Sequence, residues 1–367
     1  MHRACCFAGV NFSRWKFVFT ALAGVMLALP AIMTDSYQRI FVSHVAGLEQ
    51  TVLALPALRA LRAAFPQSQI TVASSYSALD VIRLSHCANN VFPIGRGSEI
   101  IHPRASYQSL KSLRTLRREQ YDLTIELQRG ATGGVARFLA QSGSQKKHKK
   151  LLSQIREAIL RHSFADKHAA QQYLEIMGEL GAFPLDREPK LYTEREADAR
   201  LETRLEKSGM LAGGLLVGFH PGTSPNKPRW PQERFLVVAQ KLIHLLNARV
   251  LVFAGPHERG LARAFVKQLP AKQALAFDAA PLADVTSALA RLSVLVSNHG
   301  GLTHLAAAVG TPVVAISPLT TSHATDLLSQ NHQHVRKPQL DAITTDEVYE
   351  AACQLIQSNR AESLWMR

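Results

Sequence analysis

Short apolar runs alternate along the chain with longer stretches whose apolar residues recur at helical spacing. In the first half, residues 40–45, 70–73 and 121–127 predict strands, and residues 51–64 and the basic stretch 107–118 predict helices. Strands that alternate with helices are typical of βαβ units and a mostly parallel sheet. The pattern then breaks over the polar, basic residues 141–170, and helices are expected at 170–180 and 194–208.

A second alternating series begins near residue 215. Its predicted strands are residues 215–219, 249–254, 274–277, 294–296 and 313–317, and its predicted helices are 231–246, 257–268, 282–292 and 302–309. We therefore expect an α/β protein with similar halves joined near residues 190–212. The expected segments are a leader at 1–38, domains at 39–190 and 191–345, and a C-terminal helix and tail at 346–367. Ligands of open α/β sheets bind beyond the carboxyl ends of strands, so we expect the site between the halves.

The composition is that of a globular protein, with 367 residues, 47% hydrophobic and 19% charged. These values exclude a disordered chain and a coiled coil. Cys5 and Cys6 lie in the leader, and Cys87 and Cys353 have no CxxC spacing. The cysteines therefore support neither a zinc site nor a disulfide scaffold, and they indicate a reducing compartment.

The charge balance favours anionic partners. Lys and Arg number 42 against 28 Asp and Glu, which leaves a net charge of +14. Such an excess suits nucleic acid, an anionic membrane face or phosphorylated substrates. The sequence has no zinc finger, aromatic RNA-binding pattern or basic heptad helix, so we expect no nucleic-acid partner. The densest basic run, residues 145–150, is by itself typical of a solvated loop.

The amino terminus has three interpretations. Residues 17–33 are a stretch of 17 residues without a charge, and Arg14 and Lys16 precede it. This length is near the lower limit for a membrane anchor, and it also fits the apolar core of a cleaved signal peptide. Alternatively, Met33 is the true start and residues 1–32 are an over-extended gene prediction. A chain that begins at Met33 is then expected to fold and to bind its ligand.

A glycine-rich loop is the most informative stretch of the chain. The strand that ends near Asn298 runs through His299 into Gly300 and Gly301, which open an Ala-rich helix. Free N–H groups at Gly300, Gly301 and Leu302 would attract an anion such as a phosphate. The alternative is a tight strand-to-helix turn that binds nothing.

A second loop, residues 218–235, follows another predicted strand. It carries the hydroxyls of Thr223 and Ser224, then the cations Lys227 and Arg229. Hydroxyls and cations at the carboxyl end of a strand suit a departing diphosphate. The alternative is an ordinary polar loop that Trp230 anchors by packing.

These loops carry a family resemblance. The segments HPGTS, KPRWPQERF, FAGPHERGLA and SNHGGLTHLAAAVGTPVVAISP resemble glycosyltransferase family 9, the heptosyltransferases that build the lipopolysaccharide inner core from ADP-heptose. VLALPALRALRAAFP, ITVASS and YDLTIELQ resemble earlier segments of the family in the same order, so the resemblance covers roughly residues 39–355. It implies a GT-B fold, with two Rossmann-like domains, the nucleotide held mainly by the second, and no bound metal or other cofactor.

The chain also departs from the family pattern. Members usually carry Gly-Asp before the LPAL segment, and that Asp is the proposed general base, whereas an ungapped count places Gln50 there and Glu49 one position earlier. His299 stands where members tend to have Asp, and Lys227 and Arg229 share the place of a single basic residue. These departures leave open a different nucleotide-sugar or acceptor, or an inactive nucleotide-binding protein.

The resemblance implies an inverting displacement in which an acceptor hydroxyl attacks the anomeric carbon as ADP leaves. Glu49 is the expected base and His44 its nearest rival; a surface carboxylate is the alternative for Glu49. Glu258 is expected to accept hydrogen bonds from ribose hydroxyls, and the alternative is a solvated carboxylate. His304 is expected in the nucleotide site, and the alternative is a histidine that only packs its helix. The residues expected at the nucleotide and its diphosphate are Thr223, Ser224, Lys227, Arg229, Glu258, Asn298, Gly300, Gly301, Leu302 and His304.

The resemblance also supplies an acceptor, a phosphorylated glycolipid in an anionic leaflet. The basic residues of the first half suit such a surface: Arg104, Lys111, Arg114, Arg117, Arg118 and the run 146–150. Since ADP-sugars are cytoplasmic, we expect a cytoplasmic protein, peripheral on the inner face of the inner membrane.

Overall fold

The computed structural model describes residues 37–94, 119–127, 167–210, 214–223 and 227–365. Residues from Tyr37 onward belong to one compact unit, and residues 1–36 of the predicted leader lie outside the described residues. Of the helices in the described ranges, none is long and apolar enough to cross a membrane. The predicted helix 107–118 and the basic run 145–150 also lie outside them.

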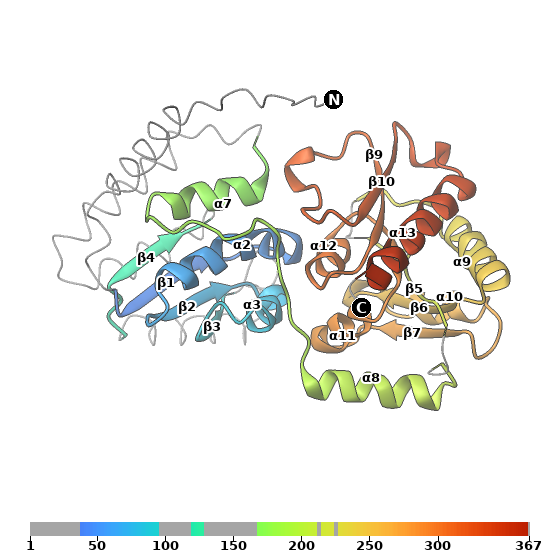
Figure 1. The fold of residues 1–367 in the computed structure, drawn as a ribbon, viewed down its shortest axis with the longest axis horizontal. Coiled ribbons are helices and arrows are strands. Elements are labelled where there is room, and N and C mark those ends of the chain that lie inside the picture. Colours follow the sequence, from blue (N-terminus) through green and yellow to red (C-terminus); the bar gives the residue numbers. More distant parts are fainter. Residues whose placement is uncertain (1–36, 95–118, 128–166, 211–213, 224–226, 366–367) are drawn as a thin grey trace, which may run out of the picture. The chain divides into compact units, whose positions relative to one another are not determined.

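The first sheet has four strands in the order β3-β2-β1-β4 (Figure 1). Its strands are β1 (Arg39–His44), β2 (Gln69–Ser74), β3 (Asn90–Pro93) and β4 (Leu123–Glu126). β1 pairs in parallel with both β2 and β4, with Val42 opposite Val72 on one side and Ile125 on the other. After their first residues, β1 and β2 are buried at every position, as expected for parallel strands with helices on both faces.

The second sheet has six strands in the order β10-β9-β8-β5-β6-β7. Its strands are β5 (Leu216–His220), β6 (Arg249–Ala254), β7 (Ala274–Asp278), β8 (Val294–Asn298), β9 (Val313–Pro318) and β10 (His332–Lys337). The strand order reverses between β5 and β8, which are neighbours with His220 opposite Ser297. In open α/β sheets such a reversal creates a crevice at the carboxyl ends of the two strands.

Helices complete the layers on both sheets (Figure 1). They are α2 (Leu48–Ala64), α3 (Leu79–Leu84), α7 (Ala169–Gly178), α8 (Arg195–Lys207), α9 (Gln232–Leu246), α10 (Leu261–Val266), α11 (Leu282–Ala290), α12 (Gly301–Ala308) and α13 (Thr345–Trp365). Helix α7 packs on α2, α8 packs on α11, and α13 packs on α9 and the second sheet. The predicted C-terminal helix therefore belongs to the layer over the second sheet.

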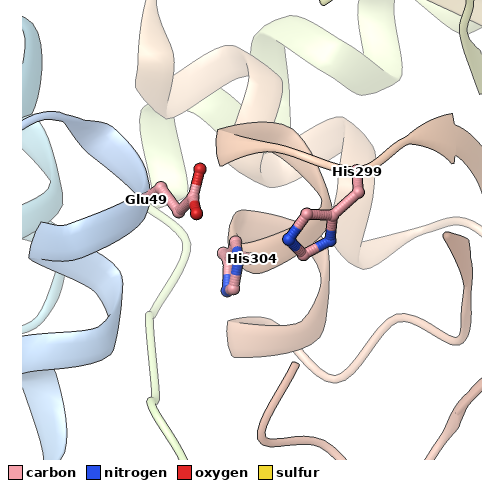
Figure 2. Close-up of side chains that lie close together, drawn as sticks. All are labelled: Glu49, His299 and His304. Carbon is pink, nitrogen blue, oxygen red and sulfur yellow. The ribbon is translucent and has the colours of Figure 1, made fainter. Parts of the chain in front are cut away.

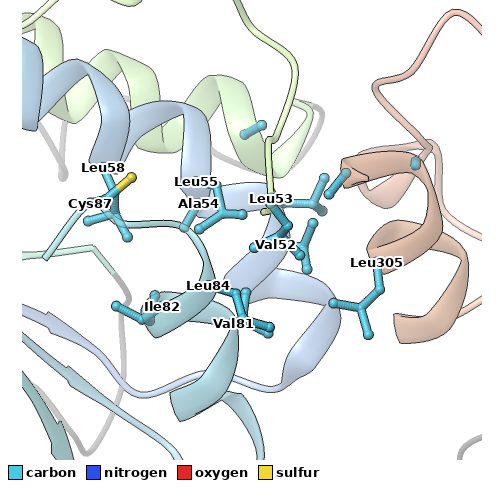
Figure 3. Close-up of a cluster of buried hydrophobic side chains, with 14 of the residues drawn as sticks. Val52, Leu53, Ala54, Leu55, Leu58, Val81, Ile82, Leu84, Cys87 and Leu305 are labelled. Carbon is cyan, nitrogen blue, oxygen red and sulfur yellow. The ribbon is translucent and has the colours of Figure 1, made fainter. Parts of the chain in front are cut away.

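One apolar cluster joins helices of the two sheets (Figure 3). Leu53 and Leu55 of α2 and Val81 of α3 are buried in the same cluster as Leu305 of α12. The backbone N–H of Leu191 also donates to the carbonyl of Ala308, at 2.9 Å. Helix α12, which follows the glycine-rich loop, is thus packed against α2 and also bonded to the segment at Leu191.

Several elements differ from the sequence-based expectation, and one of them, the six-residue helix α3, was not predicted. Strands β3 and β10 were not predicted, and both lie at sheet edges. β3 has only four residues, NVFP, and β10 has the polar sequence HQHVRK, so the apolar pattern is weak in both. The predicted helix 257–268 is shorter, because Gly260 has a positive φ of 88° and α10 starts only after it. Helix α2 begins at Leu48, earlier than the predicted residue 51, and this places Glu49 in its first turn.

Candidate active site

The carboxyl ends of β5 and β8 bring the two predicted ligand loops together. The loop after β5 leads to α9, and the loop after β8 leads through His299 and Gly300 into α12. Because His220 is opposite Ser297, both loops start at the same edge of the sheet. Sequence analysis predicted both loops, and the register makes them neighbours.

Asn298 holds the loop after β5 in place. Its Nδ2 donates to the carbonyls of Pro221 (2.9 Å) and Gly222 (3.1 Å), and its Oδ1 accepts the N–H of Trp230 (2.9 Å). The side chain is buried, so these bonds satisfy an amide that would otherwise be costly to bury. Trp230 is fully buried and its indole donates to the carbonyl of Ile343. Asn298, predicted to contact the nucleotide, thus shapes the loop.

The start of α12 has the form expected of an anion site. Thr303 Oγ1 accepts the N–H of Gly300 (3.2 Å) in a capping arrangement, and the N–H groups of Gly301 and Leu302 belong to the first turn, which has no intrahelical acceptors. A Cβ at Gly300 would meet no atom within 4 Å, whereas one at Gly301 would lie 2.7 Å from Leu48 Cδ2. Gly300 therefore faces open space, while Gly301 also lets α12 approach α2 closely.

Glu258 lies beside the same crevice, in a short 3-10 helix (Pro256–Glu258) after β6. Its Oε2 accepts the N–H of Gly255 (2.9 Å) and lies 3.1 Å from His220 Nε2. Burial raises the pKa of Glu258, but the hydrogen bonds from His220 and from backbone N–H groups outweigh burial and hold the pKa below its ordinary value. A Cβ at Gly222 would lie 2.0 Å from Glu258 Oε1, so the glycine gives the carboxylate its place against the loop.

The cations of the loop after β5 are exposed. Lys227 Nζ lies 3.1 Å from Glu49 Oε2, and Arg229 is exposed nearby in sequence. Thr223 is half-buried, and Ser224 lies outside the described residues. The pair of Lys227 with Glu49 joins the loop after β5 to the first turn of α2, which follows β1 of the other sheet.

Glu49, His299 and His304 form a cluster in which one carboxylate or imidazole atom of each lies within 4.8 Å of the others. Figure 2 shows the carboxylate of Glu49 pointing from α2 toward the two imidazoles on and before α12. His304 is 1% exposed and His299 is 6% exposed. His299 was noted as a departure from the family pattern but not predicted as a site residue.

Burial and charge set the protonation states of this cluster. Burial raises the pKa of Glu49, but its neighbours, among them the charge and hydrogen bond of Lys227, outweigh burial and hold the pKa below its ordinary value. Burial lowers the pKa of His304 to about 3, against the opposing charge of Glu49. Burial likewise lowers the pKa of His299. At neutral pH the cluster is therefore an ionised carboxylate beside two neutral imidazoles.

His44, the predicted rival base, lies in a different environment. It ends β1 with no exposed surface, and its ring meets that of Tyr173 of α7 edge-on, with 5.3 Å between centroids. This is the environment of a core histidine. The structure therefore brings Glu49, rather than His44, to the cation of the loop after β5.

Comparisons with known proteins agree with this architecture. Residues 109–351 match the model of glycosyltransferase family 9 (heptosyltransferase). The chain is 27% identical over 260 residues to lipooligosaccharide heptosyltransferase 2 of Haemophilus influenzae, covering 66% of this chain and 72% of that protein.

Two solved structures share the fold. The ADP-heptose lipopolysaccharide heptosyltransferase II of E. coli aligns with a TM-score of 0.70 at 18% identity, over 88% of this chain and 99% of that one. The E. coli heptosyltransferase WaaC, solved with ADP, aligns with a TM-score of 0.65 at 17% identity, over 86% and 99%. The two parallel sheets with their helices are thus a GT-B fold, as expected from the resemblance. The family match, which covers more than half of the chain, shows that this protein is a glycosyltransferase and belongs to family 9, the heptosyltransferases.

Proposed function

We propose that this protein transfers a heptose from ADP-heptose to a phosphorylated glycolipid of the lipopolysaccharide inner core, with inversion at the anomeric carbon. One observation carries the proposal: Glu49 Oε2 lies 3.1 Å from Lys227 Nζ. A carboxylate from helix α2, which follows β1 of the first sheet, thereby meets a cation from the loop after β5 of the second sheet. Such a pair supplies a base for the acceptor and a cation for the leaving diphosphate.

Donor binding would release the base. Lys227 has a side-chain exposure of 45%, so its ammonium can move, and a diphosphate carries more negative charge than one carboxylate. Once Lys227 turns to the diphosphate, Glu49 loses a charge that lowers its pKa. Its pKa then rises, and a carboxylate of higher pKa accepts a proton more readily.

The transfer step follows from these placements. The acceptor hydroxyl gives its proton to Glu49 while its oxygen forms a bond to the anomeric carbon. The bond from that carbon to the diphosphate oxygen breaks, and ADP leaves with the electron pair on the opposite face. Lys227, Arg229 and the first N–H groups of α12 stabilise the charge of the departing diphosphate.

The rest of the donor would occupy the crevice between β5 and β8. Thr223 and Ser224 would donate hydroxyl hydrogen bonds to the phosphates, and Glu258 would accept hydroxyl hydrogen bonds from the ribose. The half-buried Thr223 and the carboxylate of Glu258 lie on loops after neighbouring strands β5 and β6. The E. coli relative of known structure was solved with ADP, which supports an adenine nucleotide.

Charge supports the proposed acceptor and cellular location. The net charge of +14 and the basic residues of the first half suit a phosphorylated glycolipid in an anionic leaflet. The relative from Haemophilus influenzae is named for lipooligosaccharide, an acceptor of this class. We place the protein on the inner face of the inner membrane, where ADP-sugars are available, and expect co-sedimentation with anionic vesicles that salt reverses.

The experiment is ADP release by the purified protein, with and without a Kdo-lipid acceptor. Thermal shift against ADP- and UDP-sugars first identifies the donor. We expect stabilisation by ADP-heptose and ADP release that depends on the acceptor. A preference for another nucleotide-sugar would contradict the donor assignment, and ADP binding without turnover under any combination would indicate a nucleotide-binding protein instead of an enzyme.

A further inference from the structure

The Glu49 cluster contains buried nitrogens without partners. Within the described ranges, neither ring nitrogen of His299 nor Nε2 of His304 has a hydrogen-bond partner. Both side chains are more than nine-tenths buried. Buried polar atoms in folded proteins nearly always have a hydrogen-bond partner, and where the protein supplies none, a bound water or ion takes that place. These nitrogens therefore point to a ligand.

We propose that Glu49, His299 and His304 form a binding site for a divalent transition-metal ion of the zinc class. Their donor atoms lie within 4.8 Å of one another. Around a tetrahedral ion at bond lengths of about 2.0–2.2 Å, donor atoms lie roughly 3.3–3.6 Å apart. Side-chain rotations that move the donor atoms by roughly an ångström would bring all three groups to bonding distance of the ion.

The chemistry of the donors selects the ion. Two imidazoles and one carboxylate suit Zn²⁺, Co²⁺, Fe²⁺ or Ni²⁺, whereas Mg²⁺ and Ca²⁺ prefer oxygen ligands. A metal ligand must be a neutral imidazole or an ionised carboxylate, the states that burial and charge favour here. Three protein ligands also leave a coordination position open to water or a substrate hydroxyl.

Lys227 competes with the ion for Glu49. The ammonium lies 3.1 Å from the carboxylate but is not itself a ligand, so the ion must displace it or bind beside it. Removing that charge should strengthen metal binding. Arg229, exposed on the same loop, gives a matched control for a lost positive charge.

The site has a consequence for transfer, and this part rests on the proposed function. A Glu49 carboxylate bound to an ion cannot accept the acceptor proton. Transfer should therefore run without metal, be inhibited by Zn²⁺, and recover on chelation. The ion would act as a reversible brake on the base.

Metal binding is measured first, without turnover. Tag-free protein, stripped with a chelator, is titrated with Co²⁺ by visible absorption and with Zn²⁺ by calorimetry, with Mg²⁺ as the control ion. We expect one bound ion, and affinity losses of at least about 10–100-fold in Glu49→Gln, His299→Ala and His304→Ala. Thermal melting shows whether each variant is folded, and Glu49→Gln serves if a histidine variant is not.

The neighbouring histidines test the assignment of the ligands. His334 lies 5.7 Å from His299 and His332 lies 4.9 Å from His334, between ring centroids. His332→Ala and His334→Ala should bind metal as the unaltered protein does. Loss of the ion in these variants and not in the cluster variants, or no bound Co²⁺ at stoichiometric concentration, would overturn the site.

The last comparison separates the site from the function. Lys227→Met should bind Zn²⁺ more tightly and ADP more weakly, whereas Arg229→Met should leave Zn²⁺ affinity unchanged. Inhibition by Zn²⁺ that chelation reverses supports the brake. Zinc binding without inhibition would overturn the brake and the role of Glu49 as base, while an active enzyme that binds no zinc would overturn only the metal site.

Discussion

The surroundings of Glu49 and of Glu258 hold similar carboxylates in different ways. Each lies in the first turn of a helical segment that follows a strand at the carboxyl edge of a sheet. Glu258 is paired with a backbone N–H and with His220, whose side chain is 14% exposed. Glu49 is paired with Lys227, whose side chain is 45% exposed.

The difference indicates different tasks. A carboxylate bound to backbone and a largely buried ring keeps its position, which suits an acceptor of hydroxyl hydrogen bonds. A carboxylate bound to a long, exposed lysine can lose that partner when an anion arrives, which suits a base that must change its proton affinity. Substitutions in the two regions are therefore expected to have different effects on turnover and on ADP binding.

The largest expected effect is on turnover. Glu49→Gln should lower kcat by about 10²–10⁴-fold with little change in ADP affinity, because general-base catalysis is lost while the nucleotide loops are intact. Glu258→Gln should mainly weaken ADP binding, measured by calorimetry, and His44→Ala should affect kcat less than Glu49→Gln does. Nearly full turnover in Glu49→Gln, with loss in His44→Ala, would move the base to the histidine.

The next largest expected effect is on the pH dependence of stability, through His304 of the Glu49 cluster. Burial holds the pKa of His304 at about 3. Below the ordinary histidine pKa of about 6.5, His304 binds a proton in the unfolded chain but not in the folded one. The free energy of unfolding therefore decreases as the pH is lowered, by up to about 1.4 kcal/mol per pH unit. His304→Gln should remove that slope between about pH 6 and pH 4 in urea unfolding.

His334 provides an internal check on this slope. Burial also lowers its pKa to about 3, so His334→Gln should remove a similar part of the pH dependence. If the pH dependence of stability is unchanged in His304→Gln, the folded protein must protonate this imidazole near the ordinary histidine pKa.

A substitution at Gly301 tests whether this glycine serves the packing of α12 on α2 as well as ligand binding. Gly301→Val should lower the free energy of unfolding by about 1–3 kcal/mol, because the new side chain meets Leu48, and it should abolish ADP binding. Adding Leu48→Ala relieves the collision and should restore part of the stability, measured by urea unfolding. Recovery of ADP binding in the double variant would show that Gly301 serves packing alone.

The smallest expected effect concerns the ion pair itself. Lys227→Met should change stability at neutral pH by less than about 1 kcal/mol, because the lysine is solvated. Lys227 helps to lower the pKa of Glu49, so the stabilisation is present above about pH 4.3, the ordinary glutamate value, and is lost as pH falls through the lower folded value. A difference between the two proteins that persists in acid would contradict this pair as its source.

Much of the fold was predictable from local pattern. Buried parallel strands such as β6 and β8 appear as continuous apolar runs, and the glycines before α12 mark the end of a strand. Short elements and elements with weak patterns were missed, namely β3 and β10 at the sheet edges and the six-residue helix α3. The over-long helix prediction at residues 257–268 reflects Gly260, whose positive φ interrupts a pattern that hydrophobicity alone continues.

The sequence by itself determined the α/β layers, the two loops at the carboxyl edge of the second sheet, and the family, because these depend on residues close together along the chain. Only the tertiary structure decided which groups meet. Glu49 and Lys227 are 178 positions apart, and their contact requires α2 to pack against α12. Gly301 against Leu48, and His299 and His304 against Glu49, depend on the same packing, since local pattern carries no information on the register of distant surfaces.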